Sequence, residues 1–150
     1  MKILVAGGST QTLSLVSYLA MQKHRIMLID PDMAVCEQAA DMLQHPVIHG
    51  NGWSAKALKE AHAEKYDLII AATGQDADSL IACEMARKFS IHRSIAMIDN
   101  PGNAAAFHQL GIDQVICTAQ MINSMILQAL VTGSTGQCTP SGDSILSKFH

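Results

Sequence analysis

Residues 2–13, KILVAGGSTQTL, decide the fold of this chain. Residues 3–6 form an apolar run without polar alternation, which predicts a strand buried on both faces. Two glycines then permit a sharp turn, and Ser9 and Thr10 are suited to cap a following helix. Such a turn places free N–H groups at the carboxyl edge of a sheet, where a helix N-terminus attracts phosphate.

The rest of the chain repeats this alternation of short apolar runs and amphipathic segments. Pro31 is expected at the first position of the second helix, and Gly111 is expected to end the fifth. The pattern predicts an α/β fold with a doubly wound, six-stranded, mainly parallel sheet and helices on both faces. The expected strands lie at residues 3–6, 25–30, 46–49, 67–72, 94–98 and 114–117.

Composition restricts the class of protein. Of the 150 residues, 49% are hydrophobic and 15% are charged, which indicates a globular domain. We expect one domain over residues 1–131 and a flexible, Pro- and Gly-rich tail over residues 132–150. The net charge of −3 argues against a nucleic-acid partner. No apolar run is long enough to span a membrane, and the four cysteines and seven scattered histidines suggest reduced thiols and no metal site.

The first turn contains only part of a dinucleotide-binding fingerprint. In the pattern G-x-G-x-x-G the three glycine positions fall on Gly7, Ser9 and Thr12, so only the first is a glycine. The turn also lacks Arg and Lys. Two interpretations remain open: the hydroxyl groups of Ser9, Thr10 and Thr12 hold a phosphate together with helix N–H groups, or the turn preserves the fold and has lost its ligand.

Polar residues at the ends of other strands are candidates for the same site. Asp30 ends the second strand, where its carboxylate can accept both hydroxyls of a ribose; it can also be a solvated acid or a helix cap. Asn51 and Thr73 follow two further strands and are placed to meet a base or a ribose, although both types are common in turns. A third polar turn, at residues 99–101, belongs to the same expected edge.

The last predicted helix, about residues 118–131, has an apolar stripe with two interpretations. It is either a dimer surface, which methionine suits, or a face packed on the chain's own sheet. The stripe comprises Met121, Ile122, Met125, Ile126, Ala129 and Leu130.

Several segments together resemble the RCK domain, also called the TrkA N-terminal domain, over about residues 1–130. The most specific are ATGQD, residues 72–76, with the helix that follows it, and the stretch from Asn100 to Ile116 that contains NP, F, LGID and VI. The resemblance implies a Rossmann-like domain that regulates potassium or other cation transport. It also implies a cytoplasmic homodimer, held at the inner face of the membrane through a transporter or channel subunit.

The resemblance implies an adenine-nucleotide ligand, either NAD/NADH or a mononucleotide such as ATP, ADP or AMP. The family usually has glycine at Ser9 and Thr12, arginine at Thr10 and aspartate at Asn51; these departures leave a dinucleotide, a mononucleotide or no ligand open. A degenerate, dimerising scaffold is therefore one alternative. An NAD-dependent oxidoreductase is another, but there is no Tyr-x-x-x-Lys pair and no separate substrate region, so we expect no enzyme. The expected contacts are Gly7, Gly8, Ser9, Thr10, Gln11, Thr12, Asp30, Pro31, Asn51, Ala72, Thr73 and Gly74.

Overall fold

A computed structural model describes residues 1–132 of the chain. It divides into two compact units, Met1–Gln120 and a second that begins at Met121, and each is described by itself. The expected tail, apart from Thr132, lies outside the described residues, as does Cys138.

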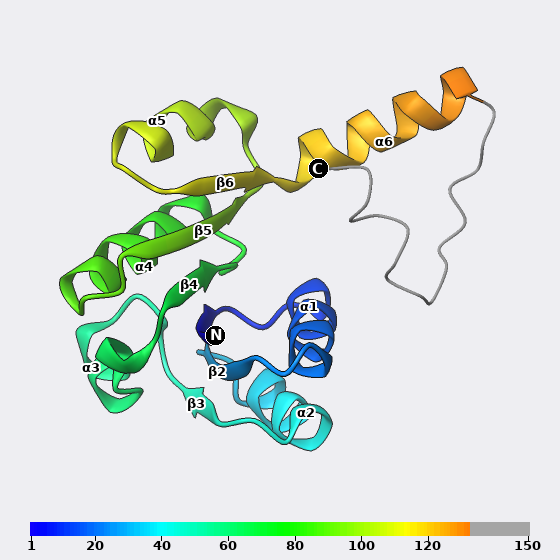
Figure 1. The fold of residues 1–150 in the computed structure, drawn as a ribbon. Coiled ribbons are helices and arrows are strands. Elements are labelled where there is room, and N and C mark those ends of the chain that lie inside the picture. Colours follow the sequence, from blue (N-terminus) through cyan, green and yellow to red (C-terminus); the bar gives the residue numbers. More distant parts are fainter. Residues whose placement is uncertain (133–150) are drawn as a thin grey trace. The chain divides into compact units, whose positions relative to one another are not determined.

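The first unit is built on a six-stranded sheet in which every neighbouring pair is parallel (Figure 1). The strand order is β3-β2-β1-β4-β5-β6, so the order reverses between β1 and β4. This confirms the predicted Rossmann-like, doubly wound sheet. The strands are β1 (Lys2–Ala6), β2 (Arg25–Asp30), β3 (Val47–His49), β4 (Leu68–Ala71), β5 (Arg93–Ile98) and β6 (Gln114–Cys117).

Helices cover both faces of this sheet, as predicted. One core cluster joins β1, β2 and β4 to α1 (Thr10–Met21) and α2 (Met33–Leu43). The other cluster packs beneath three further helices on the opposite face and includes Leu4, Leu58, Ile69 and Phe107. Those helices are α3 (Ala55–Glu60), α4 (Asp76–Lys88) and α5 (Ala104–Gln109), with short 3₁₀ helices η1 (Ala63–Lys65) and η2 (Pro101–Asn103) before β4 and α5.

Helix starts follow local capping chemistry, and one prediction about them is wrong. α2 begins at Met33, and the Asp32 carboxylate caps it by accepting the Ala34 N–H at 2.9 Å. Pro31 therefore precedes the cap instead of occupying the first helical position. A carboxylate accepts a hydrogen bond from an N–H group of the first turn. Proline only removes its own N–H group and accepts nothing with its side chain. At the start of α3, Ser54 caps the helix, because its Oγ accepts the Ala57 N–H at 3.2 Å.

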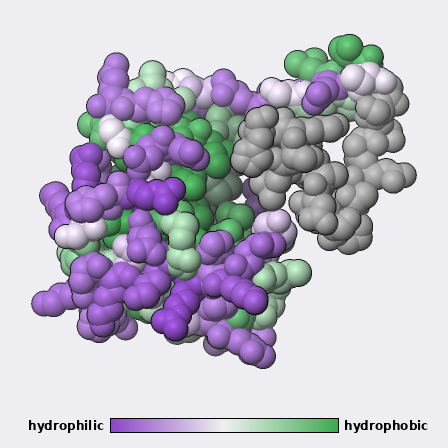
Figure 2. All heavy atoms as spheres, in the orientation of Figure 1, coloured by the Kyte–Doolittle hydropathy of each residue, from purple (hydrophilic) through white to green (hydrophobic). Residues whose placement is uncertain are grey.

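The final helix, α6 (Thr118–Thr132), has no buried residue. Figure 2 shows hydrophobic side chains at its surface. Ile126 is 54% exposed and Leu130 is 75% exposed, so the apolar stripe is not part of the buried core. Within residues 1–132, no helix combines the length and the hydropathy required to cross a bilayer. The described cysteines, Cys36, Cys83 and Cys117, are free and buried.

Candidate functional site

The turn between β1 and α1 can be formed only by glycine at its first position. Gly7 has a φ of +102°, and a Cβ there would lie 2.1 Å from the main-chain oxygen of Ala72. At Gly8 a Cβ would lie 2.5 Å from Cγ1 of Val35. The two glycines therefore allow the turn to pack directly against the end of β4 and against α2.

The start of α1 leaves three main-chain amides without a partner. Ser9 caps the helix: its Oγ accepts the Thr12 N–H at 3.3 Å, and its carbonyl oxygen accepts the Leu13 N–H at 2.8 Å. Within residues 1–132, no group accepts a hydrogen bond from the N–H groups of Ser9, Thr10 or Gln11. Three adjacent free N–H groups at the positive end of a 12-residue helix suit an anion.

Asp30 connects this turn to the end of β2. Its Oδ2 accepts the Gly8 N–H at 2.7 Å, and its Oδ1 accepts the Asp32 N–H at 2.8 Å. The residue is only 8% exposed. Each carboxylate oxygen has two lone pairs, so each retains one for a further donor such as a ribose hydroxyl.

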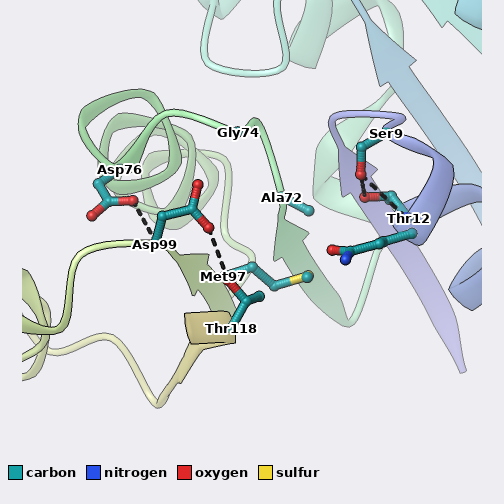
Figure 3. A pocket seen from close by; sticks show the side chains of 9 residues that line it. Ser9, Thr12, Ala72, Gly74, Asp76, Met97, Asp99 and Thr118 are labelled. Carbon is teal, nitrogen blue, oxygen red and sulfur yellow. Dashed lines mark hydrogen bonds between the residues drawn. The ribbon is translucent and has the colours of Figure 1, made fainter. Parts of the chain in front are cut away.

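A cavity of about 180 Å³ opens beside the free amides, at the carboxyl ends of β1, β4, β5 and β6 (Figure 3). Ser9 and Thr12 lie on one wall, with their hydroxyl oxygens 3.0 Å apart, and Asp76 and Asp99 lie on the other. The cavity is lined by Ser9, Gln11, Thr12, Ala72, Gly74, Asp76, Met97, Asp99 and Thr118.

Among residues 1–132, the lining of the cavity is negatively charged, since it includes two carboxylates and no Lys or Arg. Burial raises the pKa of Asp76, but hydrogen bonds from Asp99, Asn103 and Asn100 outweigh it and lower the pKa below its ordinary value. Asp99 accepts the Thr118 hydroxyl on Oδ1 at 2.8 Å. An anion bound here must therefore obtain its favourable electrostatics from main-chain amides.

The structure brings together some of the predicted site residues. Ser9, Gln11, Thr12, Ala72 and Gly74 line the cavity. Thr12 is fully buried, however, and its hydroxyl faces Ser9. The predicted residues that do not line the cavity are Gly7, Gly8, Thr10, Asp30, Pro31, Asn51 and Thr73.

Thr73, Pro31 and the main chain of Asn51 have structural partners of their own. Thr73 Oγ1 donates to the carbonyl oxygen of Gln75 at 2.9 Å, which closes its own turn. The carbonyl oxygen of Asn51 accepts the Ser54 N–H at 2.9 Å, and its exposed side chain has no hydrogen-bond partner among residues 1–132. The carbonyl oxygen of Pro31 lies 2.9 Å from His49 Nε2.

Four lining residues were missed by the sequence analysis: Asp76, Met97, Asp99 and Thr118. Asp99 and Thr118 directly follow β5 and β6, and Asp76 begins the helix after β4. Their place after the carboxyl end of a strand was the signal that could have identified them. Asp99 belongs to the polar turn at residues 99–101, which is predicted at this edge but not as part of the site.

Residues 3–118 match the TrkA-N domain family, and this match covers most of the chain. The chain belongs to the TrkA-N domain family. It is 38% identical over 116 residues to the "Trk system potassium uptake protein TrkA homolog" of Methanothermobacter thermautotrophicus, covering 77% of this chain and 54% of that protein. It is 29% identical over 135 residues to the TrkA protein of Mycobacterium tuberculosis, covering 89% and 61%. This TrkA-N domain thus spans little more than half the length of these relatives.

Two solved structures share the fold of this TrkA-N domain. The GsuK channel bound to NAD superposes with a TM-score of 0.75 and 19% identity, covering 83% of this chain and 23% of that one. Shewanella denitrificans Kef CTD in its AMP-bound form gives a TM-score of 0.71 and 17% identity, covering 90% and 84%. At these identities the likeness concerns the fold.

Proposed function

We propose that this TrkA-N domain is a regulatory module that binds an adenine nucleotide and controls potassium or other cation transport. The observation that supports this most strongly is the row of free amides at Ser9, Thr10 and Gln11, next to the Asp30 carboxylate. A phosphate would accept from these amides, and Asp30 would accept from the ribose hydroxyls.

The electrostatics of the site favour a ligand with few negative charges. Asp76 and Asp99 line the adjoining cavity, and no Lys or Arg of residues 1–132 lines it to offset a polyphosphate. We therefore expect AMP or NADH to bind more tightly than ATP, because each added phosphate charge is repelled by these carboxylates. The NAD-bound and AMP-bound structures with this fold are consistent with that ligand class.

The regulatory role is inferred from the relatives, which are named as components of a potassium uptake system. We propose that the domain acts in the cytoplasm as a homodimer and passes its nucleotide state to a transporter or channel subunit in the membrane. The exposed apolar stripe of α6 supports a dimer. No turnover of the nucleotide is proposed.

Isothermal titration with NADH, AMP, ADP and ATP tests the nucleotide site. Asp30→Ala is expected to weaken nucleotide binding by about 1–3 kcal/mol, the contribution of a charge-assisted hydrogen bond. Asp41→Ala is the matched control, because Asp41 is an exposed acid on α2 with no hydrogen-bond or ion-pair partner within residues 1–132.

Three results would change the proposal. Equal binding by the wild type and Asp30→Ala would remove Asp30 from the site. Absence of binding by all four nucleotides would leave a dimerising scaffold without a ligand. Turnover of a nicotinamide cofactor, followed by its absorbance with candidate substrates, would identify an oxidoreductase instead.

A further inference from the structure

A second cavity lies at the opposite edge of the sheet, where the strands begin. Its volume is about 290 Å³, larger than that of the cavity beside Ser9. Lys2 is the first residue of β1 and Arg25 the first of β2, so this cavity is about 15 Å along the strands from the glycine turn. It is lined by Lys2, Arg25, Met27, Ala61, His62, Lys65 and Tyr66.

The parallel register places two of its cations side by side. Lys2 is the register partner of Arg25. Each lies two residues before a side chain of the same core cluster, Leu4 and Met27 respectively, so alternation directs both cations to one face of the sheet. Like charges directly opposite each other on neighbouring strands are unfavourable. An anion between Lys2 and Arg25 would offset that repulsion.

The cations of this cavity are not neutralised within the described chain. The side chains of Lys2, Arg25 and Lys65 make no ion pair or hydrogen bond with any residue from 1 to 132. The nearby acids are engaged elsewhere: Asp67 Oδ2 accepts the Lys2 main-chain N–H at 2.7 Å, and Glu64 lies 3.6 Å from His62 Nδ1. No carboxylate from the described part of the chain lines the cavity.

The remaining lining residues provide an apolar floor with one polar group. Met27 and Tyr66 are half-buried and pack against the core, and Ala61 is buried. Burial raises the pKa of Tyr66, so its hydroxyl group stays protonated at neutral pH and can donate a hydrogen bond. The cavity thus combines three free cations with a hydroxyl donor.

We propose that this cavity binds a small anion with phosphate groups, whose oxygens contact Lys2, Arg25 and Lys65. The site is separate from the candidate nucleotide site and, within the described residues, has the opposite charge: three unpaired cations here, two carboxylates and no Lys or Arg there. A soluble phosphorylated compound and the headgroup of an anionic lipid present the same chemistry. The two sources differ in whether the anion is free or displayed on a membrane.

The test uses inorganic pyrophosphate, titrated into the full chain and followed both by calorimetry and by amide NMR spectra. We expect amide shifts centred on Lys2, Arg25 and Tyr66. We also expect the triple variant K2Q/R25Q/K65Q to bind pyrophosphate about tenfold more weakly or worse. The variant K56Q/K59Q/K88Q removes three exposed charges that do not line the cavity, and it should bind as the wild type does.

A parallel experiment identifies the source of the anion. Co-sedimentation with vesicles of equal parts phosphatidylcholine and phosphatidylglycerol is compared with phosphatidylcholine alone. Vesicle binding lost only in K2Q/R25Q/K65Q supports the lipid headgroup, and pyrophosphate binding lost only in that variant supports a free anion.

The proposal is overturned if neither probe binds, or if both triple variants weaken binding equally, which would indicate unspecific charge attraction. Shifts confined to the amides of Ser9, Thr10 and Gln11 would also overturn it, while supporting the nucleotide site. Since the two sites use different residues, the failure of one leaves the other testable.

Discussion

At the scale of the residue, Gly7 and Gly74 share a positive φ but differ in their surroundings. A Cβ at Gly7 would lie 2.1 Å from the Ala72 main-chain oxygen, whereas nothing lies within 4 Å of a Cβ at Gly74. We expect Gly7→Ala to lower the free energy of unfolding by roughly 2–5 kcal/mol, from left-handed strain and overpacking together. Gly74→Ala should cost only about 1–2 kcal/mol, the strain alone. Urea unfolding measures both, and equal losses would contradict the close contact with Ala72.

The hydrogen bonds of Asp76 lead to a prediction about folding stability at low pH. Its lowered pKa means that the hydrogen bonds from Asp99, Asn100 and Asn103 favour the ionised carboxylate. This stabilisation is fully present above the ordinary value of 3.8 and is lost as the pH falls through the lower pKa of the folded state.

Stability measured by urea unfolding between neutral pH and about pH 2 should therefore fall less steeply in Asp76→Asn than in the wild type. The control is Asp41→Asn on the exposed surface of α2. If the unfolding free energy of Asp76→Asn falls with pH as steeply as that of the wild type, these hydrogen bonds do not depend on the charge of the carboxylate.

At the scale of the element, two helices share a cap but differ in what lies next to it. Ser9 caps α1 and Ser54 caps α3, each by accepting an N–H three residues later. Replacing either with glycine should cost only a few tenths of a kcal/mol in unfolding free energy. Ser9→Gly also frees the Thr12 N–H beside the candidate nucleotide site, so we expect it to raise NADH affinity, by calorimetry, about severalfold.

Ser54→Gly should leave NADH affinity unchanged, and no gain in Ser9→Gly would place the obstacle to binding elsewhere. Restoring glycine at Thr12 is a poorer test. Thr12 is fully buried inside α1, so its replacement removes packing and adds a glycine to the helix, at a cost of about 1 kcal/mol or more.

The elements themselves were largely predictable from the sequence, because the buried parallel strands are short apolar runs separated by amphipathic helices. The end of the fifth helix agrees with the prediction, because α5 ends at Gln109, just before Gly111. The start of α2 does not, since both Pro31 and Asp32 suit a helix N-terminus and only the structure shows which residue accepts the Ala34 N–H.

The site was less predictable because it depends on contacts between distant segments. Asp30 was found by its place at the end of β2, but its bond to Gly8 depends on strand register. Asp76 and Asp99 are 23 residues apart and face one cavity only because β4 and β5 are neighbours. The sequence places both residues after strands at one expected edge of the sheet, but it does not say which strands are neighbours.

At the scale of the whole molecule, the proposed homodimer is tested through the stripe on α6. Ile126 is 54% exposed, and an exposed apolar stripe of this kind suits an interface. We expect Ile126→Glu to shift the chain from dimer to monomer in sedimentation velocity, because a charge is costly to bury. Gln128→Glu adds the same charge to an exposed polar position of α6 and should leave the dimer intact. A monomeric wild type would contradict the dimer.

At this scale too, the proposed regulatory role depends on a nucleotide whose phosphate binds the amides at the start of α1. Its most direct test is a comparison of amide NMR spectra of the full chain with AMP and with adenosine. We predict that AMP shifts the resonances of Ser9, Thr10 and Gln11 strongly, and that adenosine, which lacks the phosphate, does not. Equal shifts with both compounds, or none with AMP, would contradict phosphate binding by the free amides of α1.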